Sequence, residues 1–283
     1  MAPLVSVIVP AYRAQATLPR AVRSLLAQSL EGWEALVVSD DGLDYGALLA
    51  GEGLADPRIR HLSSGGIATG AQSARNAGLA AARGRFVAPL DADDLYLPAR
   101  LERLLPLAEA AGAAFGGVRV VEEASGRPLQ RYFDQGGVVA LSAQAFLALP
   151  VPMMPLARRD WVEGWDPAID LCDDLAFNLK LFARQPQIPL AAEILSEYRV
   201  REGSICHSPD SAARAERGYG ALLARLEADG YGLGDATLIR LAQARIEAKR
   251  GLNRAFRRAY DAGEVATFEE FLGTVRPDAG ASR

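Results

Sequence analysis

The stretch Phe86-Val87-Ala88-Pro89-Leu90-Asp91-Ala92-Asp93-Asp94 joins a short apolar run to three carboxylates within four positions. The apolar run is typical of a buried strand, but ionised carboxylates at its end repel one another unless they are solvated, paired or bound to a cation. Asp91 and Asp93 are two apart on an extended segment, so they project to the same side and can converge on one hard divalent ion. The alternative is that Asp93 or Asp94 caps a helix beginning near Leu95.

Composition restricts the class of protein. The chain has 283 residues, of which 50% are hydrophobic and 23% charged, as expected for a globular chain of one large domain or a domain with an appendage. A net charge of -4 argues against a general nucleic-acid binder. Cys172 and Cys206 lack CxxC spacing, which fits a reducing cytoplasm. The apolar start contains Pro10 and is too short to span a bilayer, so we expect a first strand and no integral membrane segment.

Strand and helix patterns alternate along the first half of the chain. Apolar, β-branched runs predict strands at Val5–Val9, Trp33–Val38, Ile59–Leu62 and before Asp91, with helical patterns between them. Such alternation predicts an α/β fold with a mostly parallel sheet, whose ligands bind beyond the carboxyl ends of the strands. Asp40, which follows the second strand, should therefore share one edge of the sheet with the aspartates.

Later segments predict more helix. A helix is expected at Leu97–Ala111 and a strand at Ala114–Glu122. Residues 136–162 contain three prolines and predict an irregular connection with room for a helix near Ala143–Leu149. Asp173–Ala183 has a buried helical stripe. From Ser211 onward the pattern is helical, at 212–229, 235–262 and near 268–272. We therefore expect a first domain at residues 1–210 and a helical appendage at 211–283.

Several linked motifs resemble those of family 2 glycosyltransferases, which have the GT-A fold, a Rossmann-like sheet flanked by helices. The matching pieces come in the family's order: Val5–Tyr12, Ser24–Ser29, Val37–Gly42, Ala74–Gly78 and Leu90–Asp94, with Asp173-Asp174 and Tyr198-Arg199 further on. Linked motifs in order are far more specific than a lone DxD. The resemblance implies a metal-dependent, inverting transfer of sugar from a nucleoside-diphosphate sugar, with uridine favoured, to an acceptor hydroxyl.

The resemblance assigns donor-side roles to several residues. Asp40 matches the position that hydrogen-bonds the base, beside a wall formed by Pro10, Ala11 and Tyr12, although an Asp that fastens a loop is the alternative. Arg75 matches an arginine near the base and phosphates. A Mg²⁺ or Mn²⁺ ion on the diphosphate would be held by Asp93, with Asp91 touching the ion through water or contacting the ribose. Each of these residues is named by its place in the motifs above.

The remaining roles concern the reaction and the loop over the donor. Asp174, preceded by Asp173, matches the general base, and the alternative is that the pair caps the following helix. Arg199 or Arg201 matches the segment that folds over the donor, where either could meet the diphosphate. His207, in the same segment, is a weaker candidate for a third metal ligand, because an isolated histidine in a polar loop is more often solvated.

Trp161 and Trp165 match the acceptor side, where an aromatic ring can stack on a sugar, but both tryptophans fit equally well as core anchors. The acceptor would be a glycan, a lipid-linked molecule or a small molecule. The helical appendage would shape the acceptor site or a homodimer interface. By analogy with the family, we expect a cytoplasmic enzyme, peripheral at most to the inner membrane face, in cell-surface polysaccharide or glycolipid assembly.

Three other functions compete with this interpretation. A sugar nucleotidyltransferase needs a glycine-rich basic loop after the first strand, which the Pro10–Arg13 segment does not supply. A dinucleotide-dependent oxidoreductase needs GxGxxG at the same place, which is also missing. A non-catalytic binding protein of the same fold has no need for Asp40, Asp91, Asp93 and Asp174 together, and donor turnover would separate it from an enzyme.

Overall fold

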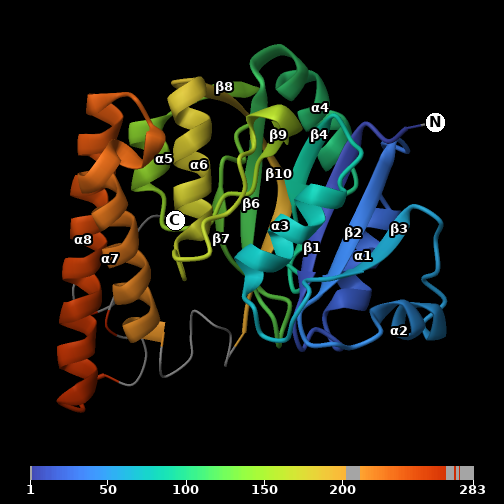
Figure 1. Ribbon diagram of the computed structural model, residues 1–283, viewed down its shortest axis with the longest axis horizontal. Helices are drawn as coiled ribbons and strands as arrows, with labels where there is room; N and C mark the ends of the chain where they lie inside the picture. The colour runs from blue at the N-terminus through green and yellow to red at the C-terminus, as the bar shows by residue number, and fades with distance from the viewer. Residues whose placement is uncertain (1, 202–210, 266–270, 272–273, 275–283) are drawn as a thin grey trace. The chain divides into compact units, whose positions relative to one another are not determined.

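The computed structural model describes residues 2–201, 211–265, 271 and 274 (Figure 1). The chain divides into two compact units. The N-terminal unit contains residues 1–167 and 173–200, and the C-terminal unit contains residues 168–172 and 201–283. The second unit therefore borrows a five-residue segment from before Asp173, whereas the sequence predicts a single boundary after residue 210.

Parallel strands form the first half of the sheet in the N-terminal unit. Strand β1 lies between β2 and β4, and β3 pairs with the outer side of β2, all in parallel. The elements of this half are β1 (Val5–Ala11), α1 (Leu18–Leu26), β2 (Trp33–Ser39), α2 (Tyr45–Gly51), β3 (Ile59–Ser63), α3 (Ala71–Ala81) and β4 (Phe86–Pro89). Each predicted strand is present, because runs of buried β-branched residues suit a sheet covered on both faces.

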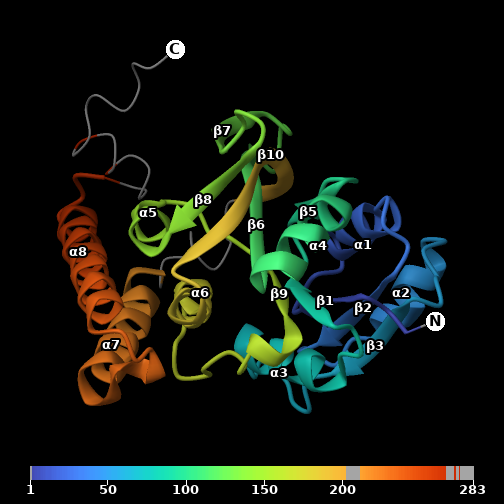
Figure 2. The ribbon, with the colours of Figure 1, turned by 90° about the horizontal axis from the view of Figure 1, so that it is seen from above.

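Alternate residues of β1 serve the two faces of the sheet. Val5, Val7 and Val9 belong to the core that α1 and α4 (Arg100–Ala111) help to form. Ile8 faces α3, and a Cβ on Gly78 of α3 would lie only 2.5 Å from its Cγ2 atom, so glycine there allows the helix to approach the sheet. Figure 2 shows α1 and α4 on one side of these strands and α3 on the other.

Beyond β4 the sheet is mixed: β9 runs antiparallel to β4 and β6, whereas β6 and β10 are parallel. The strand order is β3-β2-β1-β4-β9-β6-β10-β5, with β7 on β6 and β8 on β10. The further elements are β5 (Leu95–Tyr96), β6 (Ala113–Glu122), β7 (Pro128–Tyr132), β8 (Val138–Ser142), α5 (Ala143–Ala148), β9 (Leu156–Arg158), η1 (Arg159–Trp161), α6 (Asp173–Arg184) and β10 (Gln187–Val200). The predicted α/β class with a mostly parallel sheet is confirmed.

The segment after the aspartates differs from its prediction. Helix α4 begins at Arg100 with Ala99 as its N-cap, three residues later than expected. The capping alternative for Asp93 and Asp94 is therefore wrong. The residues expected to start the helix instead pair with β10, where Tyr96 lies opposite Ser196 and the Leu97 N–H donates to the Leu195 carbonyl. The connection over 136–162 contains β8 and β9, which were not expected because they are too short to show a clear period, and α5, which agrees with the helix suggested near Ala143–Leu149.

The C-terminal unit contains two long helices, α7 (Ser211–Asp229) and α8 (Ala236–Asp261), joined by η3 (Gly230–Gly232). Both agree with the predicted ranges 212–229 and 235–262. Phe256 packs with Phe271, Val265 and Ala212 in a small cluster. Most of the helix predicted near 268–272 lies outside the described residues. None of the helices in the described ranges is both long and apolar enough to cross a membrane.

Candidate active site

Two of the predicted aspartates lie at the same edge of the sheet. Asp40 follows β2 and Asp91 follows β4, and these two strands flank β1 in parallel register. The Asp40 N–H donates to the carbonyl of Ala11, the last residue of β1, while the Leu90 N–H donates to the carbonyl of Ile8. The carboxyl ends of the three strands therefore meet, which is where ligands of such sheets bind.

Asp40 fastens the loop at residues 64–70. Its Oδ1 atom accepts hydrogen bonds from the Ser64 hydroxyl at 2.6 Å and from the Thr69 N–H and hydroxyl at 3.0 and 2.5 Å, and its Oδ2 atom accepts from Gly70 N–H at 3.0 Å. Burial would raise the pKa of Asp40, but these donors lower it below the ordinary value. Asp40 therefore fastens a loop, as the alternative interpretation predicted. A hydrogen bond to a nucleotide base would come in addition to these four bonds.

The wall expected beside Asp40 is present at the end of β1. Ala11 is buried, Pro10 is half-buried, and Tyr12 is 42% exposed with Arg13 over its ring. The Arg13 N–H donates to Asp41 at 2.6 Å, and the Tyr45 hydroxyl donates to the same carboxylate at 2.8 Å. Asp41 therefore holds the chain that follows β1 against α2 and leaves the Tyr12 ring at the surface.

Arg75 bridges two carboxylates that are far apart in sequence. Its guanidinium bonds Asp91 at 2.5 Å from Nη2 and contacts Asp173 from Nη1, and its side chain is only 5% exposed. Burial would lower the pKa of Arg75, but Asp91, Asp173 and Asp174 raise it. Helix α3 thus brings the DxD segment and the start of α6 together through one buried cation.

The start of α6 carries the predicted base. Asp173 and Asp174 both lie in the first turn of this helix, where the helix dipole favours negative charge. Burial raises the pKa of Asp173, Arg75 opposes the shift, and Asp91 adds to it. Backbone N–H groups of Asp173 and Asp174 also bond the Asp173 carboxylate, so this residue serves the helix end as well as Arg75. The charge of Asp174 acts on Arg75 as well, which places both acids of the pair at the Arg75 cluster.

The Asp91–Asp94 segment folds into a turn, because the Asp94 N–H donates to the Asp91 carbonyl at 3.0 Å. Burial raises the pKa of Asp94 well above its ordinary value, and the charges of Asp91 and Asp93 raise it further. Three carboxyl groups are therefore crowded into one turn, and an added cation would relieve their repulsion.

The protein's own ligands do not form a complete metal cage. Within residues 2–201 and 211–265, no three His, Cys, Asp or Glu side chains are grouped so as to hold a metal ion. Mg²⁺ sites commonly use one or two carboxylates together with oxygens of a substrate phosphate. Asp91 and Asp93 fit that pattern. His207, the third suggested ligand, lies outside the described residues.

Arg199 lies near the end of β10 and contacts the same turn with its backbone. Its N–H donates to Asp94 Oδ1 at 2.9 Å, whereas its guanidinium bonds Glu123 at 2.5 Å and Glu197 at 2.9 Å. The structure thus brings Arg199 to the carboxylates, with its cationic group engaged by two glutamates. The other candidate of this segment, Arg201, is exposed.

The two tryptophans occupy different places. Trp165 is 3% exposed, stacks on Phe177 with ring centroids 4.5 Å apart, and lies beneath the Arg75 guanidinium. It is a core anchor, as one of the two alternatives predicted. The ring of Trp161 lies against Gly112, where α4 ends and β6 begins, at the edge of the sheet opposite the carboxylates. The structure does not bring Trp161 to the site.

Sequence reasoning gave no role to Asn76 and Glu123. The Asn76 side chain accepts a bond from the Trp165 N–H at 2.8 Å and donates to the Trp165 carbonyl at 2.7 Å, so it joins α3 to the segment before α6. Its place beside Arg75 in the Ala74–Gly78 motif was the available signal. Glu123 carries no such signal, because its partners Arg20 and Arg199 are 103 and 76 residues away.

Comparison with known proteins identifies the family. Residues 6–151 match the model of the family described as Glycosyl transferase family 2, and this range contains Asp40, Arg75 and the DxD turn. The chain belongs to glycosyl transferase family 2. The match ends before α6, so the family model itself does not cover Asp173 or Asp174.

Two curated bacterial proteins are similar to this family 2 chain, and their names describe a succinoglycan biosynthesis protein and a glucosyltransferase. The succinoglycan biosynthesis protein ExoO of Rhizobium meliloti is 34% identical over 72% of this chain and 62% of its own length, so the chain spans less than two thirds of that relative. The UDP-Glc:alpha-D-GlcNAc-diphosphoundecaprenol beta-1,3-glucosyltransferase WfgD of Escherichia coli is 41% identical over 35% of this chain and 38% of its own length.

A solved structure supports the family 2 fold over nearly the whole chain. Residues 1–349 of S. aureus TarS, solved in complex with UDP-GlcNAc, superpose with a TM-score of 0.60 at 16% identity. The match covers 92% of each chain. The predicted GT-A fold is therefore confirmed, with helices at the C-terminal end.

Proposed function

We propose that this protein transfers a sugar from a UDP-sugar to an acceptor hydroxyl, with inversion and with a divalent ion, in the assembly of a bacterial cell-surface polysaccharide. The observation that carries the proposal is the Arg75 cluster, in which one buried guanidinium joins Asp91 of the DxD turn to Asp173 beside the candidate base. Group transfer requires the residues that bind the leaving phosphate and the residue that activates the acceptor to lie close together, and Arg75 brings the DxD turn and the Asp173–Asp174 pair together.

The choice of uridine rests on the relatives and on the edge of the sheet. WfgD uses UDP-Glc according to its name, and TarS was solved with UDP-GlcNAc. In this chain the base would lie beside Tyr12, whose ring is exposed, near the loop fastened by Asp40. An exposed aromatic next to buried polar groups is a suitable platform for a planar ring.

Asp93 and Asp91 are the residues that would hold Mg²⁺ or Mn²⁺. When bound, the ion would neutralise the charge that develops on the departing diphosphate. The chain itself prepares this position, because the Asp91–Asp94 turn concentrates negative charge and Arg75 keeps one Asp91 oxygen in place at 2.5 Å. Ordering these ligands in advance reduces the reorganisation needed during the reaction.

Asp174 would remove the proton from the attacking acceptor hydroxyl. It sits in the first turn of α6, next to Asp173, whose carboxylate is engaged by Arg75. Asp173 would then orient the helix end while Asp174 faces the acceptor, which gives two adjacent carboxylates different tasks. Partial burial of this pair suits a base that must work near neutral pH.

The test is release of nucleoside diphosphate from a panel of UDP- and GDP-sugars, with Mn²⁺, Mg²⁺ or EDTA. We expect metal-dependent release of UDP from one donor. Asp93→Asn should abolish this metal-dependent release of UDP, because it removes the leading candidate for a metal ligand. Asp174→Asn should lower kcat by about 10²- to 10⁴-fold with little change in UDP affinity, the range typical of a lost general base.

Nucleotide binding decides what a negative result means. If no donor is hydrolysed or transferred but calorimetry shows UDP binding, the protein is a non-catalytic member of the family or lacks its acceptor, and addition of lipid-linked or glycan acceptors separates these cases. If neither UDP nor GDP binds with or without metal, the proposal is wrong.

A further inference from the structure

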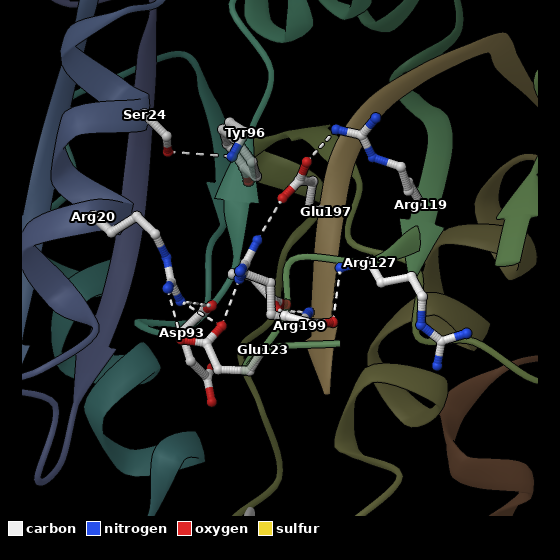
Figure 3. A network of polar contacts seen from close by, with 11 residues as sticks. Arg20, Ser24, Asp93, Tyr96, Arg119, Glu123, Arg127, Glu197 and Arg199 are labelled. Atoms are coloured by element: carbon white, nitrogen blue, oxygen red, sulfur yellow. Dashed lines mark hydrogen bonds and ion pairs between the residues drawn. The ribbon is translucent and has the colours of Figure 1, made fainter. Parts of the chain in front are cut away.

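A chain of alternating charges reaches Asp93 of the Asp91–Asp94 turn (Figure 3). It contains Arg20 of α1, Glu123 after β6, Arg199 and Glu197 of β10, and Arg119 of β6, in that order of contact. All five side chains are less than a third exposed. None of them belongs to the DxD motif, but Arg20 bonds the backbone of Asp93 and Arg199 bonds the side chain of Asp94.

Glu123 holds Arg20 with both carboxylate oxygens, at 2.6 Å from Nη1 and 2.9 Å from Nη2. The same Nη2 atom donates to the backbone carbonyl of Asp93 at 3.2 Å. The bidentate contact with Glu123 fixes the plane of the Arg20 guanidinium, so the N–H bond from Nη2 to the Asp93 carbonyl has a defined direction. Glu123 therefore acts on the peptide that follows Asp93 through Arg20.

Glu123 also holds Arg199 from the other side. Arg199 Nε donates to Glu123 Oε2 at 2.5 Å, and the Glu123 N–H donates to the Val200 carbonyl at 2.8 Å, so side chain and backbone both tie Glu123 to the end of β10. The Arg199 N–H in turn donates to the Asp94 carboxyl at 2.9 Å. Glu123 thus fixes the end of β10, and the end of β10 in turn fixes the Asp94 carboxyl.

The charges in this chain are balanced locally. Burial would raise the pKa of Glu123, but Arg20 and Arg199 lower it, so the glutamate is ionised at neutral pH. Glu197 is shared between Arg199, at 2.9 Å, and Arg119. Arg199 therefore lies between two carboxylates and is 11% exposed. A guanidinium held in this way suits a fixed support better than a ligand for a mobile diphosphate.

We propose that Glu123 is a positioning residue for the metal-binding turn: through Arg20 and Arg199 it sets the backbone of Asp93 and the carboxyl of Asp94, and Arg199 supports the turn instead of binding the donor diphosphate. The inference rests on the proposed metal-dependent function. The proposed site then includes residues outside the sequence motifs. Replacing a residue that orients metal ligands commonly lowers metal affinity by about ten- to a hundredfold.

The test compares UDP binding in EDTA with UDP binding over a Mn²⁺ titration, by calorimetry, for wild type, Glu123→Gln, Arg199→Gln and the double variant. We expect each single variant to raise the Mn²⁺ concentration needed for tight UDP binding by about tenfold or more, with UDP affinity in EDTA unchanged. The double variant should be no worse than either single one, because both interrupt the same support. Glu123→Asp should restore part of the metal affinity.

Asp56→Asn is the matched control. Asp56 forms a bidentate pair with Arg58, both bonds being 2.9 Å, but the pair lies before β3 at the other edge of the sheet. It should change stability without changing the Mn²⁺ requirement. Normal metal affinity in Glu123→Gln, or weaker UDP binding in EDTA for Arg199→Gln alone, would overturn the inference. Wild-type protein that binds UDP equally with and without Mn²⁺ would instead refute the proposed metal dependence, and the inference with it.

Discussion

Arg75 shows how one residue can serve both structure and reaction. Its guanidinium is buried between Asp91 and Asp173, and the ring of Trp165 lies beneath it, 5.9 Å from the guanidinium carbon. A buried cation of this kind is stable only while its partners are ionised, and removing one partner leaves a costly unpaired charge. Arg75 therefore holds the DxD turn and the start of α6 together without any contribution from a donor.

Asp40 offers a test with a definite pH dependence. Asp40→Asn should lower the free energy of unfolding at pH 7 by about 1.5 to 3 kcal/mol, because an amide cannot accept all four bonds that the carboxylate receives. The pKa of Asp40 is lower in the folded protein than in the unfolded chain, so its contribution is present above about pH 4 and is lost as the pH falls through the folded value.

Urea unfolding at pH 7, 5 and 3.5 would measure this dependence. The difference between wild type and Asp40→Asn should be largest at pH 7 and should narrow at pH 3.5, where the Asp40 carboxylate of the unfolded chain is already largely protonated. A difference that stays constant over this range would mean that the charge of Asp40 contributes nothing to the loop. Ser64→Ala, which removes a single donor to the same carboxylate, should show a smaller loss at pH 7.

At the scale of elements, α3 and α6 are joined through the segment between β9 and α6. Asn76 of α3 makes two bonds to the backbone of Trp165, and Trp165 stacks on Phe177 of α6 with its ring plane 8° from parallel. The helix that carries Arg75 and the helix that carries Asp173 therefore meet across one buried indole. Movement of either helix would change the distance that Arg75 must bridge.

Asn76→Asp should weaken this joint. The introduced carboxylate keeps the bond from the Trp165 N–H but faces the Trp165 carbonyl with an oxygen instead of a donor. We expect a loss of about 1 to 3 kcal/mol in the free energy of unfolding at pH 7. The loss should shrink near pH 4, because a protonated carboxyl can donate again. An equal loss at both pH values would point to a steric cause instead.

The elements themselves divide into those that sequence could predict and those that it could not. Strands β1 to β4 could be predicted from apolar, β-branched runs such as Val5–Val9. Because these strands are parallel, the sequence also predicted that Asp40 and Asp91 lie at the same edge of the sheet. The pairing of Leu95–Tyr96 with β10 depends on residues about a hundred positions later and leaves no local pattern. For the same reason no sequence pattern pointed to Glu123. Of the two alternatives for Trp161, an acceptor-side residue or a core anchor, the structure does not bring the ring to the carboxylates, because position in a motif does not fix which end of a strand a following loop reaches.

At the scale of the whole molecule, the C-terminal unit holds the five residues that precede Asp173. Arg214 of α7 bonds the Asp170 carboxylate at 2.8 and 2.6 Å, and Gly218 of the same helix approaches so closely that a Cβ there would lie 1.6 Å from the Asp170 carbonyl oxygen. Leu171 and Cys172 both have left-handed backbone angles, with φ of 49° and 75°. The chain that enters α6 is thus constrained by the helical unit.

Gly218→Ala and Gly220→Ala form a matched pair in α7. A Cβ on Gly220 meets nothing within 4 Å, so Gly220→Ala should be neutral or stabilise the unit by up to about 1 kcal/mol. Gly218→Ala should destabilise it by about 1 to 3 kcal/mol, because the backbone at Asp170 must move. Thermal unfolding followed by circular dichroism measures both changes.

Turnover measurements extend this comparison to the site. Gly218→Ala should also reduce kcat while UDP binding stays normal, because Asp174 follows the displaced segment directly and the donor-side residues lie elsewhere in the chain. Normal kcat in Gly218→Ala, together with the expected loss of stability, would show that the placement of the segment has no bearing on the reaction.

The pairing of β10 inside the sheet has a consequence for the order of events during synthesis. Among the strands of the described residues β10 comes last in sequence, yet it lies between β6 and β5, and its Arg199 meets Asp94 across 105 positions. On the ribosome, β1 to β4 can assemble early, but the acidic turn and the exposed side of β6 must wait for the final strand. Until β10 has been synthesised, the nascent chain therefore lacks the Arg199 contact to Asp94, and the edge of β6 that pairs with β10 stays open to other strands.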